Sequence, residues 1–177
     1  EILDHPVTNG EYKLFIDATG YPAPLHWQNG ILPAGKENYP VVYVNRDDVR
    51  AFMNWLSRRD NRVYRLPTVS ELEYAQRGGL KNNLYPWGDA EARGKANYNA
   101  KGDRSFDNWS EYLQPSRSGK PNGYGLFGMA GNVWQMAISR NDPATVSFKY
   151  RIYDTDNIET AIMGGSWARA DEYLRCG

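Results

Sequence analysis

The chain has 177 residues, enough for one domain that buries about two thirds of the surface its unfolded form exposes. Its 21 Lys and Arg balance 21 Asp and Glu, so no net charge favours nucleic acid or an anionic membrane, and we expect neither as a partner. No apolar run reaches the roughly 18 residues of a membrane helix. These features predict a soluble protein, either cytoplasmic or exported.

Cysteine, histidine and aromatic residues narrow the chemistry further. The single cysteine, Cys176, excludes an internal disulfide and a cysteine-built metal cage, and we expect it to be a small buried side chain. His5 and His26 lie on either side of the first expected helix, and neither is expected to act in catalysis. The content of 6 Trp, 13 Tyr and 17 Gly favours packing in which large rings cover turns. The composition therefore indicates an α+β protein with much loop.

Two helices are predicted in the first 60 residues. The first begins near Thr8 or Asn9, either of which can cap free amides, and ends before Gly20. The second follows Asn45. Its apolar residues recur at the three- and four-residue spacing of one helix face: Val49, Phe52, Met53 and Leu56.

A third helix is predicted by the capping box that Thr68 and Glu71 form, and it continues to about Arg77. Between the first and second helices, the sequence VVYV at residues 41–44 indicates a buried strand or extended segment. Helical periodicity ends at residue 79, and the stretch to Tyr124 is rich in Gly, Asn, Asp and Pro. Such a long loop needs a ligand, an ion or dense packing to order it.

Residues 146–153 alternate between apolar and polar side chains, which predicts a strand with one apolar face. The polar sequence DTDN at 154–157 predicts a turn, and residues 158–163 are expected to return as the second strand of a hairpin. We find no repeat and no linker, so residues 1–177 are expected to form a single domain.

Four phrases then identify a family resemblance. They are VTNGEY at 7–12, YRLPT at 64–68, NGYGL at 122–126 with GNVW at 131–134, and GGSW at 164–167. Together they resemble the formylglycine-generating-enzyme, or sulfatase-modifying-factor, family along the whole chain. The resemblance implies a loop-rich variant of the C-type-lectin-like fold with little regular secondary structure. It also implies that family members extend beyond both ends of this sequence.

Catalytic members of that family bind copper(I) through two cysteines spaced five apart, and the soft thiolates suit this ion. Carried over by position, the two cysteines fall on Arg169 and Leu174. Neither side chain can bind copper(I), so copper is not expected and the resemblance leans against an enzyme. Cys176 lies two residues out of register with the second position.

The resemblance also implies calcium sites, and calcium is the one cofactor that we consider for this chain. One site corresponds to Gly128, the carbonyls of Gly131 and Val133, and Gln135, where two side-chain oxygens of catalytic relatives are missing. The other site begins at Asn97 and the Tyr98 carbonyl and needs a carboxylate from the acidic loop that holds Asp103, Asp107 and Glu111. The candidates for that calcium site are Asn97, Tyr98, Asp103 and Asp107. The alternative is that these carboxylates only solvate a loop.

The resemblance also predicts that the segments after GNVW and GGSW converge on one face. The candidate ligand-binding residues there are Met136, Ile138, Arg140, Trp167, Arg169, Asp171, Glu172 and Tyr173. Aromatic and Arg residues are typical of recognition surfaces. The first hypothesis is therefore a non-catalytic module that binds a protein or glycan, including the variable proteins of diversity-generating retroelements as a special case.

Two alternatives remain open. One is a metal-dependent oxidoreductase of the same family that acts on a peptide cysteine or another thiol. The other is a structural domain that stabilises a larger protein. Fold alone does not decide among these functions.

Overall fold

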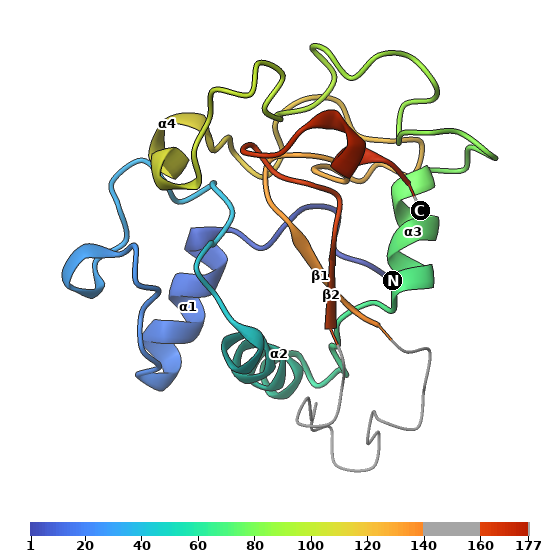
Figure 1. Cartoon of the computed structure of the whole chain (residues 1–177). Coiled ribbons are helices and arrows are strands. Elements are labelled where there is room, and N and C mark those ends of the chain that lie inside the picture. The colour runs from blue at the N-terminus through green and yellow to red at the C-terminus, as the bar shows by residue number, and fades with distance from the viewer. Residues whose placement is uncertain (140–159, 177) are drawn as a thin grey trace.

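The computed structural model describes residues 1–139 and 160–176. The elements are mostly short, in the order α1, η1, α2, α3, η2, α4, β1, β2 and η4 (Figure 1). Their bounds are α1 Asn9–Thr19, η1 Gln28–Gly30, α2 Arg46–Asp60, α3 Val69–Arg77, η2 Phe106–Asn108, α4 Trp109–Tyr112, β1 Gln135–Ile138, β2 Thr160–Met163 and η4 Asp171–Leu174.

The three longer helices begin where the sequence predicts them. Thr8, Asn45 and Thr68 each accept a backbone hydrogen bond from the first turn, and an acidic side chain three residues later completes a capping box at each. Each helix ends at a left-handed residue, which Gly or Asn adopts at low cost. The helices are thus specified at both ends by local sequence.

Helices α1 and α2 lie next to each other (Figure 1). They pack through aromatic side chains. Phe15, only 2% exposed, meets Phe52 edge-on, and Tyr12 stacks on the same Phe52 ring at 5.4 Å between centroids. Aromatic pairs of this geometry contribute about 0.5–1.5 kcal/mol beyond the area they bury. This cluster forms one part of the core.

Within the described residues, the sheet consists of β1 and β2, which pair antiparallel with Gln135 opposite Met163 and Ile138 opposite Thr160. Because neighbouring side chains of a strand point to opposite faces, β1 contacts two clusters. Ala137 packs with Leu72 of α3, whereas Ile138 packs with Leu66 and the apolar side of α2. The sheet therefore lies between α2 and α3 (Figure 1).

The predicted strands match the structure only in part. Residues 41–44 form no strand, and Tyr43 is half exposed with φ 57°, so of the two alternatives, a buried strand or an extended segment, the buried strand is wrong. A left-handed residue turns the backbone and interrupts the flat ladder that a strand requires. The strand expected at 146–153 lies outside the described residues, and Thr160–Met163, within the expected return strand, pairs with β1, which was not predicted.

The long loops are ordered by side-chain to backbone hydrogen bonds, and Asn132 is their central point. Its Oδ1 accepts from the Gln114 amide (2.9 Å) and from Asn97 Nδ2 (3.0 Å), and its Nδ2 donates to the Gln114 carbonyl (2.9 Å). Its backbone amide donates to the Asn97 carbonyl, and its carbonyl accepts from the Trp167 amide. One buried asparagine thus joins three segments that are distant in sequence.

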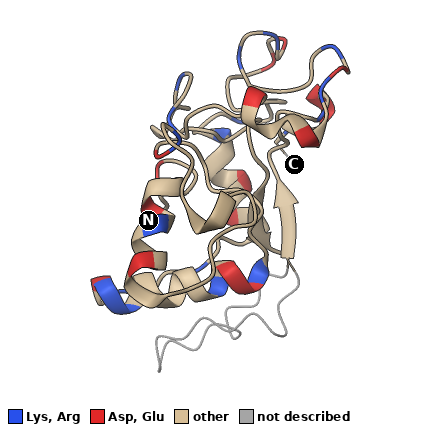
Figure 2. Cartoon of the chain, turned by 90° about the vertical axis from the view of Figure 1, so that its left-hand side faces the viewer, with Lys and Arg blue, Asp and Glu red and all other residues tan. Residues whose placement is uncertain are grey.

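Charges of both signs are interspersed over the described surface, as Figure 2 shows for one side of the molecule. Among the described residues, no helix is both long and apolar enough to cross a membrane.

Candidate functional site

The GNVW and GGSW phrases lie next to each other. The Gly131 amide donates to the Gly164 carbonyl at 2.7 Å, and the Trp167 amide donates to the Asn132 carbonyl at 3.0 Å. Gly131 and Gly164 both have positive φ, which glycine adopts freely. These contacts place Trp134 of one phrase beside the segment that follows the other.

An aromatic and cationic row forms the face that results. The Arg169 guanidinium lies 4.9 Å from the Phe106 ring centre and 5.7 Å from that of Tyr173. Tyr173 in turn meets Trp134 edge-on, with centroids 5.7 Å apart. A cation over an aromatic face at an exposed site contributes about 0.5–1 kcal/mol. The rings therefore fix the direction of Arg169 while leaving part of this surface open to solvent.

A depression of about 500 Å³ lies on this row. Its lining residues are Trp134, Ile162, Met163, Gly164, Arg169, Tyr173 and Arg175. Among these described lining residues are two arginines and no carboxylate. The depression suits a ligand that offers hydrogen-bond acceptors or negative charge beside an apolar or ring surface.

The predicted face residues that the structure describes differ in exposure: some are exposed, some are buried and one is half buried. Arg169, Tyr173, Asp171 and Glu172 are exposed on or next to η4. Ile138 and Trp167 are only 4% and 7% exposed, because one faces α2 and the other packs against Leu113 and Val133. Both present little surface to a ligand, and of the two Trp167 meets Phe106 of the face edge-on, with centroids 5.9 Å apart.

Met136 is half buried against the same cluster as Ile138. Arg140 lies outside the described residues. The face also contains residues that the sequence did not predict as ligand-binding: Phe106, which comes from η2, and the depression-lining residues Trp134, Ile162, Met163, Gly164 and Arg175. Alternation of polar and apolar residues gives no signal for such loop positions, and the contact between Phe106 and Arg169 spans more than 60 residues.

The two positions that correspond to copper-binding cysteines differ from each other. Arg169 is exposed on the face, whereas Leu174 is 1% exposed and packs with Tyr85 and Ala92. Cys176 is buried, as expected, and burial raises the pKa of its thiol. Neither position thus carries a group that binds a soft metal ion.

The first expected calcium position contains a hydrogen-bond donor. Gln135 Nε2 donates to the Gly128 carbonyl at 2.6 Å, and the Val133 amide donates to the Gly131 carbonyl at 2.9 Å. Calcium needs six to eight oxygen ligands, whereas here the carbonyls of Gly128 and Gly131 accept N–H groups and Gln135 presents its Nε2. These residues do not fit the ion.

The second expected position also contains donors. Asn97 Oδ1 accepts from Arg104 Nη1 at 2.8 Å, and the Asn97 carbonyl accepts from the Asn132 amide at 2.8 Å. Asp103 and Asp107 are exposed. Within the described ranges, no three or more His, Cys, Asp or Glu side chains are grouped so that they could hold a metal ion. This second set does not fit calcium either.

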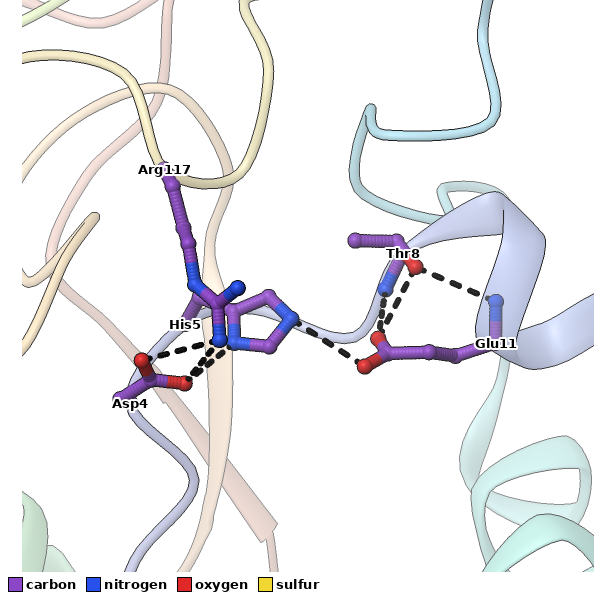
Figure 3. A network of polar contacts seen from close by, with 5 residues as sticks. All are labelled: Asp4, His5, Thr8, Glu11 and Arg117. Atoms are coloured by element: carbon purple, nitrogen blue, oxygen red, sulfur yellow. Dashed lines mark hydrogen bonds and ion pairs between the residues drawn. The ribbon is translucent and has the colours of Figure 1, made fainter.

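His5 lies in a polar network at the N-terminal segment (Figure 3). Its Nδ1 contacts Asp4 Oδ1 at 2.6 Å, and its Nε2 contacts Glu11 Oε1 at 3.2 Å. Glu11 also caps α1 through Thr8, and Arg117 donates to both Asp4 oxygens. Hydrogen bonds from Arg117, and then from His5, lower the pKa of Asp4 to about 2. Sequence reasoning missed these acidic partners, although Asp4 directly precedes His5; the contacts give His5 a structural role.

His26 packs among aromatic rings instead. Trp109, Tyr43 and Trp27 surround its imidazole, with centroids 5.0, 5.7 and 6.2 Å away. Burial lowers the pKa of His26 to about 4, so the ring is neutral at physiological pH.

The fold defines the class to which this domain belongs. The crystal structure of CarF superposes with a TM-score of 0.70, covering 98% of this chain and 77% of that chain at 21% identity. Treponema denticola variable protein 1 superposes with a TM-score of 0.64, covering 97% and 74% at 23% identity. At these identities the likeness concerns the fold alone, and it confirms the predicted loop-rich formylglycine-generating-enzyme fold.

The family follows from the sequence match. Residues 1–177 match the model of the "Sulfatase-modifying factor enzyme 1-like domain", so the chain belongs to that family. It is 33% identical to "Inactive C-alpha-formylglycine-generating enzyme 2" of Bos taurus, over 75% of this chain and 40% of that protein. It is 38% identical to the "Formylglycine-generating enzyme" of Thermomonospora curvata, over 76% of this chain and 44% of that protein. The chain thus spans less than half the length of these relatives.

Proposed function

We propose that this domain is a non-catalytic module that binds a protein or glycan on the face around Arg169 and Tyr173. One observation carries the proposal: the two positions expected to bind copper hold an exposed arginine, stacked between Phe106 and Tyr173, and a buried leucine. The resulting surface offers guanidinium donors next to ring faces. That combination is typical of residues that dominate binding at protein interfaces.

The ligand contacts in this proposal come from two groups. Trp134 and Tyr173 supply ring surface, while Arg169 and Arg175 supply donors to carboxylate, carbonyl or hydroxyl oxygens. Asp171 and Glu172 lie at the rim on η4, where rim charges mainly affect association rate and selectivity. A glycan and an extended peptide both offer acceptor oxygens for such donors.

The experiment uses probes of both kinds. The whole chain would select binders from a phage-displayed random peptide library and from an array of neutral and acidic oligosaccharides. Arg169→Ala and Tyr173→Ala should each weaken the selected probe by about tenfold or more, because truncation of a central Arg or Tyr costs above roughly 1.4 kcal/mol. The measurement is the Kd of each variant for the selected probe.

Tyr124→Ala is the matched control. Tyr124 is 44% exposed, compared with 43% for Tyr173, but it packs on Tyr74 of α3 at 5.4 Å between centroids. Its removal should leave the Kd unchanged. If no probe is selected, or if all three variants bind a selected probe equally, the proposal for this face fails.

A special case of the proposal is a variable protein diversified by a retroelement. The likeness in fold to Treponema denticola variable protein 1 motivates it. Sequencing the gene from several isolates of the source organism tests it: substitutions concentrated at the exposed face positions support it, and substitutions spread evenly over the surface contradict it.

The second candidate function is a metal-dependent oxidoreductase acting on a peptide cysteine or other thiol. Relatives named formylglycine-generating enzyme, 38% identical in one case, favour it. It requires metal ligands other than side chains at positions 169 and 174. Copper retention separates the two functions.

A further inference from the structure

Arg104 is a half-buried cation inside the loop that leads to η2. Its Nη1 donates to Asn97 Oδ1 at 2.8 Å and lies 3.5 Å from the Trp167 carbonyl oxygen. The guanidinium carbon lies 4.6 Å from the centre of the Tyr112 ring. One side chain thus contacts the start of the loop, the end of α4 and the GGSW phrase.

The backbone around Arg104 is folded to bring it there. Asn99 Oδ1 accepts from the amides of Asp103 (3.1 Å) and Arg104 (3.3 Å), and Asn99 Nδ2 donates to the Arg104 carbonyl (3.2 Å). The Asn99 amide itself donates to the Arg169 carbonyl at 2.8 Å. The loop is therefore bonded directly to the segment that carries the face.

The oxygens around Arg104 are the kind that bind a hard cation. Asn97 supplies an amide oxygen and Trp167 a backbone carbonyl, and both face one positive group. Arginine keeps its charge at every accessible pH and offers five donors. A guanidinium at this position neutralises the oxygen dipoles without taking up an ion from solution.

We propose that Arg104 is a positioning residue that does the structural work of a bound calcium ion. It fastens residues 97–112 beneath the face independently of calcium. The Gln135 Nε2 bond to the Gly128 carbonyl, at 2.6 Å, closes the other expected calcium position in the same manner. Any effect of Arg104 on ligand binding at the face rests on the proposed function. The predicted independence of calcium does not.

The experiment compares thermal unfolding of the whole chain in EDTA and in millimolar calcium. The wild-type midpoint should be the same in both, because N–H donors already satisfy the oxygens. Arg104→Ala should lower the midpoint by roughly 3–10 °C in both buffers, since it leaves the partly buried Asn97 and Trp167 oxygens without a charged donor. Arg104→Lys keeps the charge but loses the planar guanidinium group. Its unfolding midpoint should lie between those of wild type and Arg104→Ala.

Arg93→Ala is the control, since Arg93 is an exposed arginine in a neighbouring loop. Hydrogen exchange measured by mass spectrometry supplies a local readout that a general loss of stability does not reproduce. In Arg104→Lys, peptides covering 97–112 and 166–170 should exchange faster, while those covering α1 and α2 keep their wild-type rates.

Three results would overturn the proposal. They are a wild-type midpoint that rises with calcium, an Arg104→Ala midpoint equal to that of Arg93→Ala, and exchange that increases equally over the whole chain in Arg104→Lys. None of these measurements needs a ligand, so a failed probe selection leaves this test intact.

Discussion

The first 79 residues and the loops from 80 to 134 reach order by different means. In the first region, three capping boxes and three left-handed C-caps define helices whose bonds lie within a few residues of each other. In the second, Asn132 bonds to Asn97 and Gln114, and Asn122 Nδ2 bonds to the Ala75 carbonyl at 2.7 Å. Local signals specify the helices, whereas the loops depend on individual polar groups that are distant in sequence.

We therefore expect substitutions in the loops to destabilise the domain more than substitutions at the helix caps. A helix tolerates the loss of one cap because its other hydrogen bonds and its buried face remain, at a cost near 1 kcal/mol. A loop that is held by individual hydrogen bonds has no remaining regular hydrogen bonds or buried face to keep its conformation when one contact is removed. The face around Arg169 is built on these loops, so small backbone changes there should affect binding as well as stability.

The largest expected effect follows from Gly131. Its φ is +78°, and a Cβ at this position would lie 2.5 Å from the Asn97 carbonyl oxygen. Gly131→Ala should lower the free energy of unfolding by about 3 kcal/mol or more, because left-handed strain adds to a clash with backbone. Urea unfolding measures the change.

Gly102→Ala is the matched control for that variant. Gly102 has a similar φ of +73°, but among the described residues no heavy atom beyond its chain neighbours lies within 4 Å of the place a Cβ would take. The free energy of unfolding of this variant should fall only by the cost of placing alanine in the left-handed conformation, about 1–2 kcal/mol. Equal losses for the two variants would show that contacts between loops do not set the sensitivity of this region.

Sequence predicted the helical region well because its signals are local. Thr68 and Glu71 are three residues apart, and their capping box is visible in the sequence and present in the structure. β1 was missed because four residues, Gln135–Ile138, with a partner more than 20 residues away carry little pattern of their own. Tyr43 was misjudged because its valine neighbours favour a strand while its φ of 57° prevents one.

The candidate site was predictable only in outline. The family resemblance located Arg169 and Tyr173 on one face, and both are exposed there. The alternation of β1 side chains, which buries Ile138, was not visible without the strand assignment. The positions of Phe106 and Arg104 depend on the fold of a loop that has no periodic signal.

A smaller effect is expected in the helical region, at Glu71. Its carboxylate accepts two bonds from Arg65, each 2.7 Å, and one from the Thr68 amide, and the Arg65 bonds contribute most to lowering its pKa from 4.5 to about 2. A lowered folded-state pKa stabilises the fold above pH 4.5, and this stability is lost as pH falls toward 2. Because the side chain is half exposed, the contribution is about 1 kcal/mol.

Glu71→Gln should therefore be about 1 kcal/mol less stable than wild type at neutral pH and equal to it near pH 2, as urea unfolding across this range would measure. Glu91→Gln, at an exposed position in the loop region, serves as the control and should match wild type throughout. A constant difference between Glu71→Gln and wild type at every pH would contradict the assignment of the pKa shift to the folded state.

The proposed function requires that positions 169 and 174 do not bind copper. Metal-free protein would be incubated with copper(I) under reducing, oxygen-free conditions, dialysed extensively and analysed for metal content. We predict copper well below one equivalent, because Arg169 and Leu174 offer no thiolate and Cys176 is a single buried thiol. Copper retained near one equivalent, together with oxygen uptake in the presence of a thiol, would contradict this account and favour the oxidoreductase.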